Sequence, residues 1–552
     1  MASKLSLKRS RIRQGLEKAS IFACLVLAMV MFIVGLSSGN DHLNNNSKES
    51  SLVTAIATAM PHNGWAPHTI YFSAFGSKSL DSKIVSYEWD LDGDGRFDYD
   101  ATAQNGYASY SYSKTGERTI TLRVTDEEGK TATDSLIINI KHPASSSVDY
   151  WSVFDDSLIR RIDVSLLSID WEKIWSEPEA KYQAKADLKI FGRQLQDVGF
   201  RMRGQFSLRV SGSKKPWKFD LDAYIPDQEY QNLKQLLLIN NVGDPSLLRE
   251  KLAYELMEFA GVPASHTAYV ELWVDLLDDN EEPIYWGIYT LIERVDNKYI
   301  ANRFGRDSKG GNLYKASHAQ RGPMDLIYYG ESITDYPLQD GQYAYGKMNN
   351  EDEADYSDII NLCRVVDYNS YSDDQSFMAA LEEVINVDTF LRYMAVITIL
   401  DNWDSYPYTG NNFYLFNNPT TDRFEWIPWD LTWGMNANAP LFGKTGESII
   451  GSAPLFDRVF AIEAYQTRYA AYVDLIVRHR FNPAYMTEHI KNYHSLIKPY
   501  INKSTGDQAF FGEEPMFNNN QFDNSWQELI SFIENRGIYL EKSLNDFLSS
   551  NQ

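Results

Sequence analysis

The chain has 552 residues, of which 43% are apolar, and its formal net charge is −23. A chain of this length folds as about two or three domains. Its excess of acidic groups excludes the basic face that nucleic-acid binding requires. Two cysteines, Cys24 and Cys363, are too few for a disulfide framework or a thiolate zinc site. We therefore expect an acidic multidomain protein with no nucleic-acid partner.

The N-terminus joins a basic segment to an apolar one. Residues 1–18 contain six basic residues and one acidic residue, and residues 19–36 form an apolar run. At about 1.5 Å per residue, a helix of that length just crosses a bilayer. Because the basic flank favours the cytoplasm, we expect a transmembrane signal anchor at 19–36 with extracytoplasmic domains after it. The alternative is a signal peptide cleaved near Gly35–Ser38, which would make the protein secreted.

Residues 37–50 are polar and of low complexity, which indicates a linker. From residue 51 to residue 141, short segments alternate apolar and polar residues around Trp89, a pattern that predicts an all-β immunoglobulin-like sandwich. The stretches YEWDLDGDG and YSYSKTGERTITLRVTDEEGKTATDSLIINI resemble a PKD domain. That resemblance implies an extracellular spacer or adhesion module, which would contact proteins or polysaccharides of a cell surface.

One loop of this predicted sandwich is strongly acidic. Asp90, Asp92, Asp94 and Asp98 take relative positions 1, 3, 5 and 9, with glycine at position 6, as in part of a calcium-binding loop. Position 12 is Ala101 instead of the usual glutamate, and no helical pattern flanks the loop. Two interpretations stay open: a weak Ca²⁺ site and a solvated turn.

A short linker at 142–150 leads into a mixed α+β region from 151 to 552. Apolar–polar alternation predicts a series of strands in its first half. Helices are predicted from Asp244 to Gly261, with Asp244 as the N-cap, and over 388–400. The pattern is chiefly helical after about residue 455. The predicted strands are 187–192, 198–204, 216–221, 268–275 and 284–293.

The most informative chemistry lies between residues 401 and 430. Asp401 and Asp404 follow the apolar helix, the amides Asn411 and Asn412 come next, and Asp430 ends a strand. An acid, an asparagine and a second acid at a strand end are how phosphoryl-transfer enzymes space a base and two metal ligands. The asparagine lies seven or eight residues after Asp404, whereas the usual catalytic loop has about five. The order of the elements, a strand lobe with one helix followed by a helical lobe, is also that of a kinase.

The segments LLLINNVGDPSLLREKLAYELMEFAGVPA, WGIYTLIERVD, GNLYKA, DNWDSYPYTGNNFYLF and IPWDLTWG resemble the spore coat protein H (CotH) kinase family. The resemblance implies an atypical, secreted or surface-associated kinase that transfers phosphate from ATP to Ser or Thr of proteins. It also implies that Asp404 accepts the substrate proton and that Asn412 and Asp430 hold Mg²⁺ or Mn²⁺. Asp401 competes for the base role, but Asp404 lies nearer the amides.

Three further residues are candidates for binding the nucleotide. Lys218 lies on a predicted strand of the small lobe, where a lysine would pair with the α- or β-phosphate, although a solvent-facing lysine is the alternative. Glu250 or Glu255 would brace that lysine. Arg203 begins the run Arg-Gly-Gln-Phe-Ser where the family has Arg-Gly-Asn-Ser-Ser, and Glu293 ends a strand at the position of a hinge.

Two other classes of function remain. A surface adhesin or scaffold would have the same fold without catalytic activity, and the departure of residues 203–207 from the family's run is compatible with this alternative. A polysaccharide-binding or polysaccharide-degrading protein would use paired carboxylates with tryptophans. The retention of Asp404, Asn412 and Asp430 favours the kinase.

Overall fold

The structure is a computed structural model that describes residues 53–141, 148–204, 206–209, 214–435, 439–443, 450–501 and 519–550. The predicted basic tail, the predicted membrane anchor at 19–36 and the linker at 37–50 lie outside these described residues. Over the described part of the chain, we find no helical stretch with the length and hydropathy that a bilayer crossing needs. Residues 52–552 form one compact unit.

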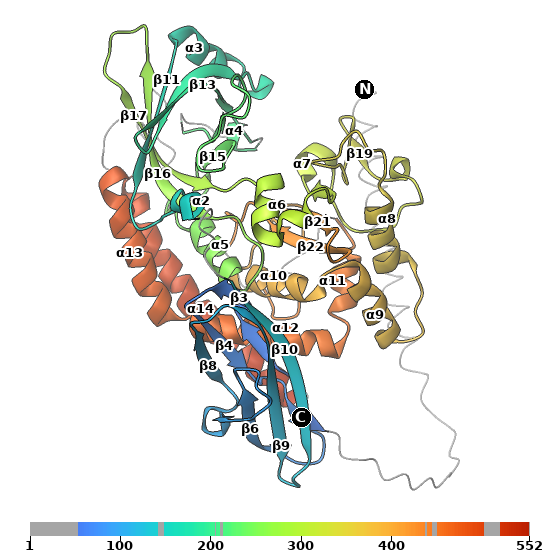
Figure 1. The fold of residues 1–552 in the computed structure, drawn as a ribbon. Coiled ribbons are helices and arrows are strands. Elements are labelled where there is room, and N and C mark those ends of the chain that lie inside the picture. The colour runs from blue at the N-terminus through green and yellow to red at the C-terminus, as the bar shows by residue number, and fades with distance from the viewer. Residues whose placement is uncertain are drawn as a thin grey trace, which may run out of the picture. The chain divides into compact units, whose positions relative to one another are not determined.

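The first part of this unit is a β-sandwich, as predicted (Figure 1). A five-stranded sheet in the order β3-β10-β9-β6-β7 faces a three-stranded sheet in the order β2-β4-β8, and both contribute to one core. Trp89 lies fully buried in that core, 5.6 Å from Phe72 of the opposite sheet, and its indole N–H donates to the carbonyl of Gly106. The strands are β1 (Val53–Thr54), β2 (Thr58–Met60), β3 (Asn63–Trp65), β4 (His68–Ser73), β5 (Lys78–Ser79), β6 (Ile84–Asp90), β7 (Tyr99–Asp100), β8 (Ala108–Tyr112), β9 (Gly116–Asp126) and β10 (Thr131–Lys141).

A closed seven-stranded barrel follows, in the order β11-β12-β13-β14-β15-β17-β16 (Figure 1). Helix α3 (Ser168–Ser176) contributes Trp171 to the core of this barrel. The ring centroid of Trp171 lies 5.6 Å from that of Trp217 and 4.9 Å from that of Trp286. Each predicted strand of this region is present. The strands are β11 (Arg160–Leu166), β12 (Ala184–Ile190), β13 (Arg193–Met202), β14 (Trp217–Asp220), β15 (Gln235–Ile239), β16 (Thr267–Leu276) and β17 (Ile284–Ile292).

Helix α5 (Arg249–Phe259) begins later than the predicted start at Asp244. Leu247 adopts a left-handed backbone conformation with φ of 59°, which a helix does not allow. Asp244 still satisfies a free amide of the first turn, because its carboxylate accepts the N–H of Arg249 at 2.9 Å. The segment before α5 is therefore a capped turn.

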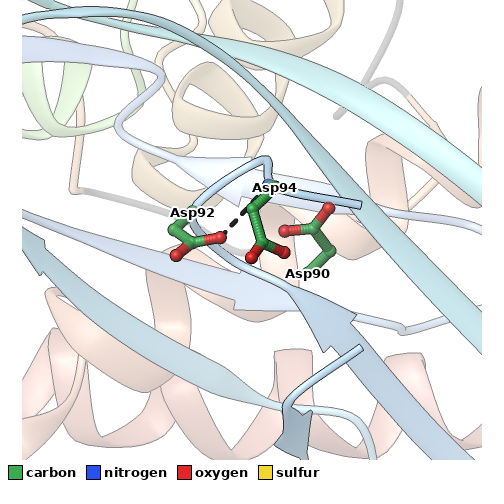
Figure 2. A group of neighbouring side chains, drawn as sticks. All are labelled: Asp90, Asp92 and Asp94. Carbon is green, nitrogen blue, oxygen red and sulfur yellow. Dashed lines mark hydrogen bonds between the residues drawn. The ribbon is translucent and has the colours of Figure 1, made fainter. Parts of the chain in front are cut away.

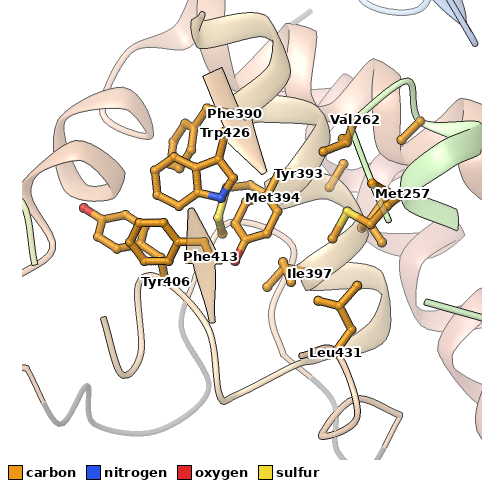
Figure 3. Close-up of a cluster of buried hydrophobic side chains, with 14 of the residues drawn as sticks. Met257, Val262, Phe390, Tyr393, Met394, Ile397, Tyr406, Phe413, Trp426 and Leu431 are labelled. Carbon is orange, nitrogen blue, oxygen red and sulfur yellow. The ribbon is translucent and has the colours of Figure 1, made fainter. Parts of the chain in front are cut away.

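The predicted apolar helix is present as α10 (Val387–Leu400), and every residue of it except Asp388 is buried. It packs beside a three-stranded sheet made of β18 (Leu313–Lys315), β21 (Phe413–Asn418) and β22 (Arg423–Pro428). Figure 3 shows the shared core, in which Trp426 stacks on Phe413 at 4.3 Å and lies 5.0 Å from Phe390. This core fixes the end of α10 against the two strands that flank the predicted site.

The remaining elements are mostly helices, and the part after about residue 455 is helical as expected. Helix α12 lies against α10, and α13 lies against α14. These helices are α2 (Val148–Ser152), α4 (Phe206–Arg209), α6 (Asn297–Phe304), α7 (His318–Arg321), α8 (Ser357–Cys363), α9 (Asp374–Val384), α11 (Pro454–Val459), α12 (Glu463–His479), α13 (Pro483–Ile501) and α14 (Asn519–Ser550), with a two-stranded ribbon of β19 (Leu338–Gln339) and β20 (Gln342–Tyr343).

Candidate active site

A cleft of about 600 Å³ lies where the barrel, α5 and the sheet β18-β21-β22 meet. Its lining contains both acidic and basic groups, which sets it apart from the apolar cores on either side. The residues that the argument uses are Arg203, Glu250, Lys315, Asp404, Asn412 and Asp430. Three of the predicted catalytic and metal residues, Asp404, Asn412 and Asp430, thus share one cleft.

Asp404 lines the cleft from the loop that follows α10. Its carboxylate accepts hydrogen bonds from Asn412 Nδ2 at 2.9 Å, Asn411 Nδ2 at 3.2 Å and Thr409 Oγ1 at 3.1 Å. Three donors on one carboxylate fix its orientation. Asn412 is held with a φ of 61°, an uncommon conformation that is often found at functional sites.

Asp401 has a different position. It is the C-cap of α10, has a left-handed φ of 50° and is 2% exposed. It does not belong to the lining of this cleft. The geometry therefore favours Asp404 over Asp401 as the residue that meets a substrate, which was the order of preference expected from the sequence.

Asp430 and Glu250 add two further carboxyl groups to the lining of the cleft. The Thr432 hydroxyl donates to Glu250 Oε2 at 3.1 Å and lies 3.4 Å from Asp430 Oδ1. Burial, together with the charge of Asp404, raises the pKa of Asp430. Burial and the charge of Asp430 raise the pKa of Glu250 to about 8. Clustered buried acids of this kind are stabilised by a bound cation.

Arg203 and Lys315 supply positive charge to the same cleft. The Arg203 guanidinium lies 5.8 Å and the Lys315 ammonium 5.2 Å from the ring of Trp429. Burial, reinforced by the charge of Arg203, lowers the pKa of Lys315 to about 7. Burial also lowers the pKa of Arg203. Two desolvated cations in one cleft favour an anionic ligand such as a phosphate chain.

Lys315 had no assigned role in the sequence prediction, although it belongs to the motif GNLYKA. Lys218, the predicted phosphate-binding lysine, is paired with Asp220 at 2.8 Å and does not line the cleft. Glu293, the predicted hinge residue, is 1% exposed, forms an ion pair with Arg303 at 2.6 Å and lies outside the lining as well. The assignments of Lys218 and Glu293 stay predictions, and Lys315 is better placed for a phosphate.

The Arg-Gly-Gln-Phe-Ser run at 203–207 is described in part, and it reaches the cleft. Arg203, Gly204 and Ser207 line it, whereas residue 205 and the side chain of Phe206 lie outside the described residues. Gly204 has a φ of 91°, and a Cβ there would lie 2.3 Å from Ser207 Oγ. A side chain at this position would be strained and would crowd the serine hydroxyl, so the close turn requires glycine.

The donor set of the cleft fits Mg²⁺ and a triphosphate. Mg²⁺ prefers hard oxygen ligands and retains several waters, so that one amide and one or two carboxylates are enough. Asn412, Asp430 and Glu250 offer such groups, and Arg203 and Lys315 offer donors for phosphate oxygens in the same cleft. The residues present are therefore compatible with a metal–nucleotide complex.

The acidic loop of the β-sandwich is a separate candidate. Asp90, Asp92 and Asp94 bring carboxylate oxygens within 4.8 Å of one another, and Asp98 is not part of this group. Figure 2 shows these three side chains. Asp90 is buried and accepts the backbone N–H groups of Gly93 and Gly95, each at 2.8 Å. The turn is thus ordered by its own hydrogen bonds, and both earlier interpretations remain open.

The fold and the cleft define a two-part α+β protein, with a strand lobe and a helical lobe around a cleft that carries both signs of charge, preceded by a β-sandwich. The chain belongs to the CotH kinase protein family, whose family model matches residues 200–540, more than half of the chain. The PKD domain model matches residues 55–140, which confirms the predicted identity of the sandwich.

Similar proteins occur in bacteria and fungi. The inner spore coat protein H of Bacillus subtilis is 24% identical over 368 residues, which cover 65% of this chain and 90% of that protein. The invasin CotH3 of Rhizopus delemar is 21% identical over 55% of this chain and 50% of its own length. Among solved structures, the PKD1 domain of the Vibrio cholerae metalloprotease PrtV matches 16% of this chain and 96% of its own, with 27% identity and a TM-score of 0.14.

Proposed function

We propose that this protein is an extracytoplasmic protein kinase that transfers a phosphoryl group from ATP to Ser or Thr hydroxyls of surface or secreted proteins. The observation that carries the proposal is the convergence of Asp404, Asn412 and Asp430 with Arg203 and Lys315 in one cleft. Membership of the CotH kinase protein family supports it. Relatives named as a spore coat protein and an invasin support a location at a surface.

Asp404 acts on the acceptor. The acceptor hydroxyl oxygen forms a bond to the γ-phosphorus, the bond from that phosphorus to its bridging oxygen breaks, and ADP leaves. The hydroxyl proton passes to the Asp404 carboxylate, which its three amide and hydroxyl donors hold in place. General-base assistance of this kind contributes about 10²–10⁴-fold to a rate.

The other charged residues bind and orient the nucleotide. Arg203 and Lys315 donate to phosphate oxygens, and Asn412 and Asp430, with Glu250 nearby, would hold Mg²⁺ or Mn²⁺. When bound, the metal neutralises charge that develops on the phosphate oxygens. The Trp429 ring, next to both cations, keeps their side chains away from bulk water and so strengthens their contact with an anion.

The test is a transfer assay on the full chain with γ-labelled ATP, Mg²⁺ or Mn²⁺, and Ser/Thr peptides. Asp404→Asn and Asp430→Asn should each lower transfer by about 10²-fold or more. The matched control is Asp422→Asn, since Asp422 is exposed on the same hairpin and has nearly the same backbone conformation as Asp430, with φ of 55° against 50°.

The outcomes separate the candidate functions. Label that persists in both Asp404→Asn and Asp430→Asn would overturn the site assignment. A chain that neither binds nucleotide nor transfers label under any of these conditions would favour a surface adhesin, the role that the name of the Rhizopus invasin suggests for that relative.

A further inference from the structure

The PKD domain contacts the central helix of the kinase-like region through a buried arginine. Arg392 lies in the middle of α10 and is 2% exposed. Its Nε donates to Asp388 at 2.7 Å, and its Nη1 donates to the carbonyl of Ala260 at 2.9 Å and to that of Ala59 at 3.2 Å. Its Nη2 contacts the His62 ring, where Nε2 is the nearer nitrogen and Nδ1 lies 3.0 Å away. One guanidinium therefore joins three separate segments of the chain.

The arginine supplies hydrogen-bond donors to an acceptor in each of these segments. Ala260 is the C-cap of α5, where helix carbonyls lack partners within the helix. Ala59 belongs to β2 of the PKD domain. Burial, with the neighbouring charge of Arg392, lowers the pKa of His62 to about 3, so that the neutral ring can accept a hydrogen bond. A buried charge that is fully hydrogen-bonded is costly to leave with fewer partners.

Apolar contacts surround this arginine. Met60 and Phe75 of the PKD domain are buried in the same hydrophobic core as the helices of the kinase-like region. Tyr71 of β4 stacks on His479 of α12 at 4.0 Å and lies 6.1 Å from Phe259 of α5. The contact thus combines buried apolar side chains with a buried, hydrogen-bonded guanidinium.

The two helices joined by Arg392 are the ones that carry the candidate site. Glu250 lies in the first turn of α5, and Asp404 lies four residues after the end of α10. We infer that the PKD domain is a built-in structural part of the catalytic body, and that Arg392 is the positioning residue that couples its docking to the placement of α5 and α10. The docking stands on contacts alone, and only its consequence for catalysis rests on the proposed function.

The first experiment asks whether the PKD domain stays bound without its covalent link. Residues 142–147 of the full chain are replaced by a protease recognition sequence, the protein is cleaved, and the products are separated by size-exclusion chromatography at micromolar concentration. We expect the two pieces to elute together and to melt in one calorimetric transition. Pieces that elute separately would overturn the inference, since a spacer domain has no reason to remain bound.

The second experiment tests the polar centre from the PKD side, where folding of the kinase-like region is not disturbed. In the cleaved protein, His62→Ala should raise the dissociation constant of the two pieces about tenfold, because it removes a partner of a buried charge. The control is Lys78→Ala, which removes an ion pair with Glu463 (2.7 Å) that lies largely in solvent and should change the constant less than about threefold.

The positioning role has its own measurement. In the uncleaved chain, His62→Ala and Arg392→Lys should increase amide hydrogen exchange in α5 and in the loop at 401–404, whereas Lys78→Ala should not. Unchanged exchange in both variants would refute the role of Arg392 as a positioning residue. None of these readouts requires phosphoryl transfer, so that an inactive enzyme would leave the docking inference intact.

Discussion

Replacing Lys315 by methionine should weaken nucleotide binding, and replacing Lys218 in the same way should not. Lys315 lines the cleft, whereas Lys218 is outside the lining and is paired with Asp220. A hydrogen bond between charged groups contributes about 1.5–3 kcal/mol. The Lys315→Met variant should therefore bind a non-hydrolysable ATP analogue with Mg²⁺ about 10- to 150-fold more weakly.

The pH dependence of binding gives this prediction a second readout. Because the pKa of Lys315 is lowered to about 7, about half of the side chains are charged at pH 7 and about a tenth at pH 8. A phosphate requires the charged form, so the affinity of the wild-type chain that depends on Lys315 should fall about fivefold between these pH values. The Lys315→Met variant should lose this fall.

Isothermal titration calorimetry at pH 7 and pH 8 measures both effects, and Lys218→Met, on β14 of the barrel, is the matched control. Binding by Lys315→Met within twofold of the wild type would refute the reasoning. So would a loss of equal size in Lys218→Met, because that lysine would then be the phosphate ligand that the sequence suggested. An unchanged pH dependence in Lys315→Met would show that another group titrates.

Three further predictions concern stability. Burial alone would raise the pKa of Glu255, but Lys251, His489 and Tyr493 outweigh it and lower this pKa to about 2. Glu255 therefore stabilises the fold by up to about 3 kcal/mol above about pH 4.5, and this stabilisation is lost as the pH falls toward 2. In urea unfolding at pH 7, 4 and 3, the free energy of unfolding should fall less steeply with acid in Glu255→Gln than in the wild type, and the exposed control Glu488→Gln should behave like the wild type. Trp426→Ala should lower the free energy of unfolding by about 3–5 kcal/mol because it empties the centre of the core beside α10, and an effect no larger than that of the exposed Leu277→Ala would contradict this packing. Ca²⁺ at about ten times its dissociation constant should stabilise the PKD domain by about 1.4 kcal/mol, which a rise in melting temperature would show. Asp92→Asn should abolish this rise. If the melting temperature of the wild type does not rise, the loop is a solvated turn.

The regular elements were largely predictable because local patterns specify them. The apolar run at 388–400 predicted α10 to within one residue, and alternation predicted β6, β9 and β10 of the sandwich and five of the seven barrel strands, but not β11 or β15. The start of α5 was not predictable, since the capping signal at Asp244 is genuine but Leu247 takes a left-handed conformation that no local pattern announces. Propensity and capping describe a helix in isolation, whereas its first turn here is set by packing.

In the candidate site, too, local sequence patterns predicted some residues, whereas long-range contacts bring in the others. Asp404, Asn412 and Asp430 lie within 27 residues, on the loop after α10, directly before β21 and two residues after β22, so a local pattern of acid and amide was enough to group them. Lys315 and Glu250 come from distant segments and join the cleft only through the pairing of β18 with β21 and the packing of α5. Strand periodicity shows which side chains share a face, but it does not show which face of a closed barrel meets the cleft, and for that reason Lys218 was selected from the sequence and Lys315 was assigned no role. The sequence shows where charged residues occur along the chain, but only the long-range contacts of the folded chain decide which of them line the same cleft.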